Sequence, residues 1–173
     1  VELIEELDPT ATDLEGYLFP ETYSLPRGAT ADDLVEVMVA EFRQAFSVNL
    51  REEAERRRMT VRAVVTLASL IQKETGSLEE HQLVSAVYNN RLRIGMPLQC
   101  DPTVIYALQL ADLYNGNLTR ANLEFDSPYN TYRHAGLPPG PIASAGKAAL
   151  QAALRPADVG YLYFVSRNDG THA

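Results

Sequence analysis

The segment from Val61 to Ile71 constrains the fold most, because it is apolar almost all round. Thr60 before it is a favourable N-cap residue, and Gly76 after it suits the end of a helix, so the sequence predicts one helix between them. A helix without a polar face is buried on every side. We therefore expect this helix to lie inside the domain.

Glu74 is the residue of this helix with catalytic potential. Helical periodicity places it on the same face as Leu67, Leu70 and Ile71. Apolar neighbours disfavour a charged carboxylate, and the negative end of the helix dipole disfavours it further, by about 0.3–1 kcal/mol. Both effects favour the protonated group that a general acid requires. The alternative is a solvated residue in the last helical turn with no chemical role.

The composition indicates one globular domain over residues 1–173, with 46% hydrophobic residues to form a core. The net charge of −8 argues against general binding of nucleic acid, which requires a basic face. The basic cluster Arg56–Arg58 follows three glutamates, Glu52, Glu53 and Glu55. We interpret it as a solvated helix face with i,i+4 ion pairs rather than a phosphate site.

The chain shows no pattern typical of a metal, cofactor or disulfide site. Cys100 is the only cysteine and lacks the local signature of a catalytic nucleophile. His81, His134 and His172 do not have the spacing of metal ligands. We expect no cofactor and no metal. No stretch approaches the roughly 18 apolar residues of a membrane span. Since the first residue is Val1, we expect part of a longer protein, with any anchor upstream.

The predicted fold is α+β, a mostly helical domain with short strands near the N- and C-terminal ends. Capping and periodicity predict five more helices, at about 30–46, 50–58, 77–93 and 101–108, and from Ser144 to before Pro156. The helix from Ser77 begins with a Ser-x-x-Glu capping box and forms a hairpin with the buried helix, which places Glu74 at the bend. The strands are predicted at 16–23 and 161–165. The long loop 126–143 is expected to be functional and to hold a fixed shape.

Three segments carry side chains suited to sugar binding, namely 72–75, 89–106, and 129–132 with the Gly-Leu-Pro-Pro-Gly loop at 136–140. Amides and hydroxyls bind sugar hydroxyls, and tyrosine rings cover the apolar faces of sugars. The candidate substrate contacts are Gln99, Asp101, Thr103, Asn130, Thr131 and Tyr132. Asp101 has a favoured structural alternative as the N-cap before Pro102. Asn90 and Arg91 are expected to brace the helix hairpin, and Tyr106 to belong to the core.

Two of these motifs identify a resemblance. The run Asn-Arg-Leu-x-x-Gly-Met-x-Leu-Gln-x-Asp-Pro-Thr-Val-x-Tyr at 90–106, and Tyr-Asn-Thr-Tyr at 129–132 followed by Gly-Leu-Pro-Pro-Gly, resemble the endolytic murein (lytic) transglycosylase family, YceG-like. The resemblance extends from Leu14 to Val165. It implies an enzyme that cleaves the β-1,4 bond between N-acetylmuramic acid and N-acetylglucosamine within peptidoglycan strands. The catalytic glutamate of the family falls on Glu74.

The resemblance also implies a setting. The partners would be peptidoglycan strands and, in the intact protein, the membrane and the cell-wall synthesis machinery, at the outer face of the bacterial inner membrane. The chain departs from the family pattern in three places. The first Glu of the family's Glu-Lys-Glu is Gln72 here, the N-terminal membrane helix and LysM-like domain of the family are absent from this chain, and the usual continuation past Ala173 is missing.

A single carboxyl group suffices for the implied reaction. Glu74 would protonate the leaving oxygen and then accept the proton of the muramic C6 hydroxyl as it attacks C1, leaving a 1,6-anhydro end. Two alternatives stay open. One is a muramidase-type hydrolase with Asp101 as second carboxylate. The other is a weakened glycan-binding or scaffolding module of the cell wall, suggested by Gln72 and the missing flanks.

Overall fold

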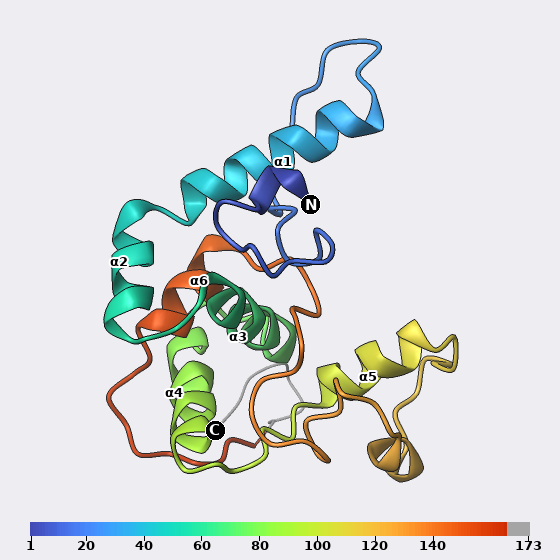
Figure 1. Ribbon diagram of the computed structural model, residues 1–173. Coiled ribbons are helices and arrows are strands. Elements are labelled where there is room, and N and C mark those ends of the chain that lie inside the picture. The colour runs from blue at the N-terminus through green and yellow to red at the C-terminus, as the bar shows by residue number, and fades with distance from the viewer. Residues whose placement is uncertain (166–173) are drawn as a thin grey trace.

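A computed structural model describes residues 1–165. The elements in chain order are η1 (Glu2–Ile4), α1 (Ala31–Ala45), α2 (Val48–Arg56), α3 (Val61–Glu74), α4 (His81–Arg93), α5 (Asp101–Leu110), η2 (Arg120–Glu124) and α6 (Lys147–Leu154). Figure 1 shows α3 surrounded by the other helices, with the N-terminal segment and α1 on one side and α5 with η2 on another. No helix within these residues is long and apolar enough to cross a membrane.

The apolar helix is central, as predicted. α3 contacts α2, α4, α5 and α6, and its residues from Val64 to Ile71 are all buried. Thr60 caps it, with the Thr60 hydroxyl accepting a hydrogen bond from the Ala63 N–H at 3.1 Å. Thr30 caps α1 in the same way, within a full capping box with Asp33. These two helix starts are confirmed because their signals are local and need no distant partner.

The predicted α+β class is wrong for the part of the chain that the structure describes: residues 1–165 contain no strand. Residues 161–165 alternate between exposed and half-buried positions, as a strand would, but have no regular secondary structure. Within residues 1–165 no β-bridge forms to them. The carbonyls of Tyr161 and Leu162 instead accept hydrogen bonds from the side chains of Asn90 and Arg91 in α4. Helix side chains thus satisfy the backbone groups that a neighbouring strand would have satisfied.

The segment at 16–23 is not a strand either. A turn forms at its start, where the Tyr17 N–H donates to the Leu14 carbonyl at 3.0 Å. The Phe19 N–H donates to the Met38 carbonyl of α1, so a helix rather than a strand supplies its partner. Tyr17 is fully buried, with its ring 5.1 Å from that of Phe42 in an edge-on contact. Aromatic residues at these positions therefore reflect burial against α1 and not β-pairing.

Two helices begin later than their sequence signals predicted. α4 starts at His81 rather than at Ser77, since the Thr75 hydroxyl donates to Glu80 at 2.8 Å and thereby draws the glutamate away from the predicted capping box. α6 starts at Lys147 with Gly146 as N-cap, and not at Ser144. At neither start does the N-cap residue itself supply a side-chain cap.

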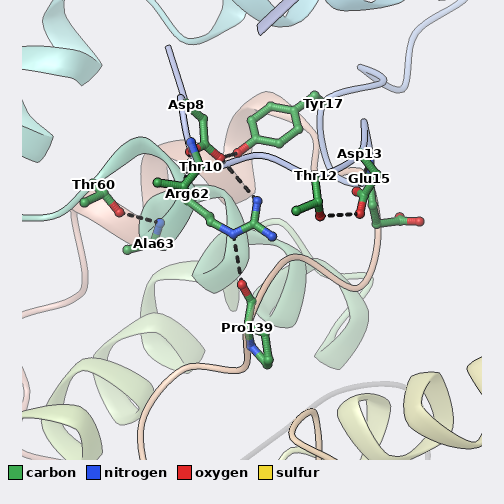
Figure 2. A network of polar contacts seen from close by, with 10 residues as sticks. All are labelled: Asp8, Thr10, Thr12, Asp13, Glu15, Tyr17, Thr60, Arg62, Ala63 and Pro139. Atoms are coloured by element: carbon green, nitrogen blue, oxygen red, sulfur yellow. Dashed lines mark hydrogen bonds and ion pairs between the residues drawn. The ribbon is translucent and has the colours of Figure 1, made fainter. Parts of the chain in front are cut away.

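A partly buried polar network connects the N-terminal segment to α3 and to the long loop (Figure 2). Arg62 donates to the Pro139 carbonyl at 2.9 Å and to the Asp8 carboxylate at 3.3 Å. Asp8 is 3% exposed and also accepts hydrogen bonds from Tyr17 and Thr10. Nearby, Gly16 has φ +83°, and a Cβ there would lie 2.5 Å from Pro141. Only glycine fits this close approach between the two segments.

Candidate active site

Glu74 lies in the last residue position of α3, half-buried at the hairpin bend, as the sequence predicted. Its apolar neighbours Leu67, Leu70 and Ile71 are fully buried behind it. The Glu74 Oε2 atom accepts a hydrogen bond from the Tyr88 hydroxyl at 2.8 Å and lies 3.5 Å from the Cys100 Sγ atom. One oxygen atom of Glu74, at the end of α3, is thus contacted by a side chain from α4 and by another from the start of α5.

Tyr88 is the residue that sequence reasoning missed. It projects from α4, is 1% exposed, and packs edge-on against Phe164 at 6.0 Å between ring centroids. Burial, together with the negative charges that Cys100 and Glu74 can carry, holds the pKa of Tyr88 well above its usual range. Tyr88 therefore remains a hydrogen-bond donor. A signal was available: Tyr88 follows Val84 by four residues on the buried face, and a buried tyrosine hydroxyl usually has a polar partner.

Cys100 is buried and precedes α5 as its N-cap residue. Burial and the adjacent Glu74 carboxylate raise the pKa of its thiol well above the usual value. A nucleophilic cysteine requires the opposite, an exposed thiolate of lowered pKa. The geometry therefore gives Cys100 a packing role beside Glu74.

The 129–132 segment of the long loop is attached to the start of α5 by hydroxyl and backbone groups. The Thr131 hydroxyl accepts from the Cys100 N–H at 3.0 Å and lies 2.9 Å from the Thr103 hydroxyl. The Thr131 carbonyl accepts from the Gln99 N–H at 3.1 Å. Asn130 donates to the carbonyls of Leu123 and Phe125 at 2.9 and 2.7 Å. This part of the loop is therefore held by specific bonds.

The six predicted sugar contacts fall into two groups. Thr103, Asn130 and Thr131 are at most 1% exposed and form the internal bonds just described. Gln99 and Asp101 are exposed, and Tyr132 is half-buried. Tyr132 donates a hydrogen bond to the Asp101 carboxylate. Burial, that bond and the charges of Asp101, Cys100 and Glu74 raise the pKa of Tyr132 far above its usual value. Tyr132 is thus electrostatically coupled to both carboxylates.

Asp101 does not have its predicted place as N-cap. Cys100 occupies that position, and Asp101 is the first residue of α5, which has no side-chain cap. Gln99 has φ +50°, an unfavourable conformation for a residue with a Cβ. The backbone determines where the Gln99 and Asp101 side chains lie. It takes a left-handed conformation at Gln99, whose N–H donates to the Thr131 carbonyl.

Asn90 and Arg91 also differ from their predicted placement, whereas Tyr106 agrees with it. Asn90 and Arg91 do not brace the α3–α4 hairpin. They bind the extended segment after α6, and Arg91 also donates to the Leu98 carbonyl at 2.7 Å. Tyr106 lies half-buried against the core, as predicted, with its ring 4.9 Å from that of Tyr129. Within residues 1–165 no cluster of three or more His, Cys, Asp or Glu could hold a metal ion.

Gln72 has an identifiable structural partner. Its side-chain oxygen accepts a hydrogen bond from the Gly146 N–H at 3.1 Å, at the start of α6. One turn earlier in α3, the Ser69 hydroxyl accepts from the Ile142 N–H at 3.0 Å. Gly146 has no side chain with which to cap α6, so Gln72 supplies an acceptor from a neighbouring helix.

Comparisons with known proteins show what the chain as a whole is similar to. A model of the YceG-like family matches residues 2–173. A protein of Bacillus subtilis named endolytic murein transglycosylase is 39% identical over 158 residues, which cover 91% of this chain and 43% of that protein. A protein of Streptococcus pneumoniae with the same name is 34% identical, over 88% of this chain and 28% of its own length. The chain thus spans less than half the length of these two relatives.

A solved structure shows the same fold. The crystal structure of a YceG-like protein from Listeria monocytogenes superimposes with a TM-score of 0.82 at 36% identity, covering 96% of this chain and 57% of that one. The family match over nearly all residues and this superposition lead to one conclusion: the chain belongs to the YceG-like family.

Proposed function

We propose that this chain is the catalytic part of an endolytic peptidoglycan lytic transglycosylase. The observation that carries the proposal is the Glu74 carboxyl group, backed by buried leucine and isoleucine side chains and held through Oε2 by the buried Tyr88 hydroxyl. Relatives with the name endolytic murein transglycosylase support peptidoglycan as the substrate. The chemistry then places the chain in the cell envelope, and the membrane and cell-wall synthesis machinery are proposed neighbours of the intact protein.

In the first step, Glu74 in its acid form donates its proton to the glycosidic oxygen between N-acetylmuramic acid and N-acetylglucosamine. The bond from C1 to that oxygen breaks, and the electron pair leaves with the N-acetylglucosamine oxygen. Positive charge develops at C1 and its ring oxygen, as in other glycosidases. The apolar wall behind Glu74 supports this step because it favours the neutral acid before transfer.

In the second step, the Glu74 carboxylate accepts the proton of the C6 hydroxyl of the same muramic residue. The C6 oxygen forms a bond to C1 and closes the 1,6-anhydro ring, so water is not consumed. The Tyr88 hydroxyl stabilises the carboxylate that exists between the two steps. Since Tyr88 binds Oε2, we assign the transferred proton to Oε1.

The members of the predicted contact set that are not fully buried are the proposed sugar ligands. Gln99, Asp101 and Tyr132 present an amide, a carboxylate and an aromatic hydroxyl at the surface beside Glu74. We assign Thr103, Asn130 and Thr131 a supporting role, because their polar groups bind the backbone that carries these ligands.

A muramidase-type hydrolase is the second candidate, favoured by one observation: Asp101 is a second carboxylate whose charge acts on Tyr132 together with that of Glu74. The products distinguish the two reactions. Mass spectrometry of purified peptidoglycan digested with the chain is expected to show 1,6-anhydromuramic ends, which are one water lighter than hydrolytic ends. Reducing muramic ends would establish the hydrolase. The absence of cleavage by a folded, substrate-binding chain would leave only the glycan-binding module.

A further inference from the structure

A second possible binding site lies at the opposite end of α3 from Glu74. A groove of about 530 Å³ is lined by Arg57, Arg58, Met59, Thr60, Ala63, Asn89, Leu92, Arg93 and Leu137, which we call the basic groove. A second hollow of about 180 Å³ shares Thr60, Ala63 and Leu137 with it and is also lined by Pro138 and Pro139. With a rise of 1.5 Å per residue, α3 separates the groove from Glu74 by about 16–20 Å.

The charge of the basic groove contrasts with that of the molecule, whose net charge is −8. Arg57, Arg58 and Arg93 are all exposed, and among residues 1–165 none of the three forms an ion pair. Arg56, by contrast, pairs with Glu52 and Glu53, as the sequence interpretation predicted for the whole cluster. Arg93 donates a hydrogen bond to the Asn90 side-chain oxygen at 3.3 Å. Three exposed arginines that line one groove without a carboxylate partner in the described part of the chain indicate an anionic ligand.

The backbone at the end of α2 brings Arg58 to the groove. Arg58 follows the end of α2 with φ +56°, where glycine would be favoured and a residue with a Cβ costs free energy. The unfavourable conformation turns the chain so that Arg58 and Met59 both line the groove. Hydrogen bonds at the end of α2, from the Arg58 N–H to the Glu55 carbonyl and from the Met59 N–H to the Ala54 carbonyl, hold Arg58 in this conformation.

The remaining lining residues indicate the class of anion. Met59, Ala63, Leu92 and Leu137 form an apolar wall, and Thr60 and Asn89 add polar groups. A peptide with carboxylates beside aliphatic side chains matches both features, because guanidinium groups bind carboxylates in a bidentate manner. Leu137 follows Tyr132 by five residues in the same loop, so the two positions are at most about 18 Å apart.

We propose that the basic groove binds the carboxylates of the peptide stems of peptidoglycan, while the glycan strand lies at Glu74. This inference rests on the proposed function, since it takes peptidoglycan as the substrate. The groove would then hold the strand in place through its peptides, at a distance from the bond that is cleaved.

The test measures binding of a synthetic stem-type peptide that has free side-chain and C-terminal carboxylates, a fluorophore and no sugar. Fluorescence anisotropy is expected to show binding to the wild-type chain. The double variant Arg58→Glu/Arg93→Glu should weaken that binding at least 10-fold, and so should amidation of both peptide carboxylates. The matched control is Arg27→Glu/Arg120→Glu, which changes the net charge equally at exposed arginines outside the groove and should leave binding unchanged.

Three results would overturn the proposal: no binding of the peptide to the wild-type chain, equal loss in both double variants, or tighter binding of a poly(glycerol phosphate) probe than of the peptide. If circular dichroism shows that Arg58→Glu/Arg93→Glu does not fold, two other measurements replace it. Amidation of the peptide and the variant Arg58→Gln/Arg93→Gln should each weaken binding, and unchanged binding in both would overturn the proposal. Cleavage of peptide-free glycan strands is measured in parallel. A chain that binds the peptide without cleaving glycan contradicts the proposed function alone, and a chain that cleaves without binding contradicts the groove alone.

Discussion

At the scale of single residues, the hydrogen bond from Tyr88 to Glu74 positions the carboxyl group that we propose as the general acid. Tyr88 is buried and cannot reorient without disturbing its contact with Phe164. Its hydroxyl therefore fixes the position of the Glu74 carboxyl group at 2.8 Å. A general acid acts only when its proton lies within hydrogen-bonding reach of the bond that breaks, so this fixed position is as important as the acidity.

The first prediction concerns Glu74 itself. Glu74→Gln keeps the volume of the side chain and can still accept from Tyr88, but it cannot donate and regain a proton. We expect cleavage of purified peptidoglycan to fall to background, with an unchanged circular dichroism spectrum and melting temperature. A folded Glu74→Gln chain that cleaves at a rate near that of the wild type would refute the assignment.

The second prediction concerns Tyr88. Tyr88→Phe removes a hydrogen bond to a charged group, worth about 1.5–3 kcal/mol, so the rate of cleavage should fall about 10–100-fold. The pH–activity profile should also move to higher pH, because the hydroxyl stabilises the carboxylate and its loss favours the neutral acid. Tyr161→Phe, at an exposed tyrosine, is the control and should leave both unchanged. A lower rate with the profile unmoved would mean that Tyr88 only supports packing.

At the scale of elements, α3 organises the domain through its polar residues as well as through its apolar ones. Ser69 and Gln72 lie three residues apart on one face of α3 and accept from the backbone of Ile142 and Gly146. The end of the long loop and the start of α6 are thereby attached to the helix that carries Glu74. Gln72 thus acts in the placement of α6, two residues away from the proposed acid.

The third prediction follows from this role of Gln72. Gln72→Ala should lower the free energy of unfolding by about 0.5–2 kcal/mol, the usual cost of losing a helix cap. Cleavage should stay within a few-fold of the wild-type rate. Gln72→Glu retains an acceptor and places an anion near the start of α6, which the helix dipole favours, so its stability should equal or exceed that of the wild type. Chemical denaturation and a cleavage assay measure both effects, and a loss of activity as large as that of Glu74→Gln would place Gln72 in the reaction.

At the scale of the whole molecule, the network around Asp8 connects the N-terminal segment, α3 and the long loop. Burial alone would raise the pKa of Asp8, but hydrogen bonds from Thr10, Tyr17 and Arg62 outweigh it and hold the pKa below its ordinary value of 3.8. Because the folded pKa is the lower one, the carboxylate stabilises the fold fully above about pH 4. That contribution is lost as the pH falls through the folded value.

The fourth prediction tests this network. Asp8→Asn leaves buried donors without a carboxylate, so the free energy of unfolding at pH 7 should fall by about 1–3 kcal/mol. The difference from the wild type should shrink as the pH falls below about 4, because the unfolded chain takes up the proton first and the folded carboxylate follows at its lower pKa. Glu5→Gln, at an exposed carboxylate in the same segment, should show neither effect. A difference that stays constant from pH 7 to pH 3 would exclude ionisation of Asp8 as its source.

Much of the helical framework could be read from the sequence, because its signals are local. The apolar run from Val61 to Ile71, with Thr60 before it, predicts a buried helix without reference to any other part of the chain. The position of Glu74 at the end of that helix follows from the same pattern. The motifs at 90–106 and 129–132 likewise indicated the family before any geometry was known.

Only the tertiary structure decided which partners these local elements take. The strands predicted at both ends required a neighbouring strand, and α1 and α4 satisfy their backbone groups instead. The helix predicted from Ser77 begins at His81 because Thr75 binds Glu80. Thr103, Asn130 and Thr131 have the chemistry of sugar ligands, yet their polar groups bind backbone and hydroxyl groups inside the protein.

The physical reason is that sequence patterns report the periodicity and chemistry of one segment, whereas hydrogen-bond partners depend on segments far away in the chain. Tyr88 meets Glu74 across 14 residues, and Arg62 meets Pro139 across 77. The sequence by itself determined the buried helix, the candidate acid and the family. The packing of the helices decided the contact that positions the proposed acid, the side chains that replace β-pairing and the meeting of three arginines at one groove.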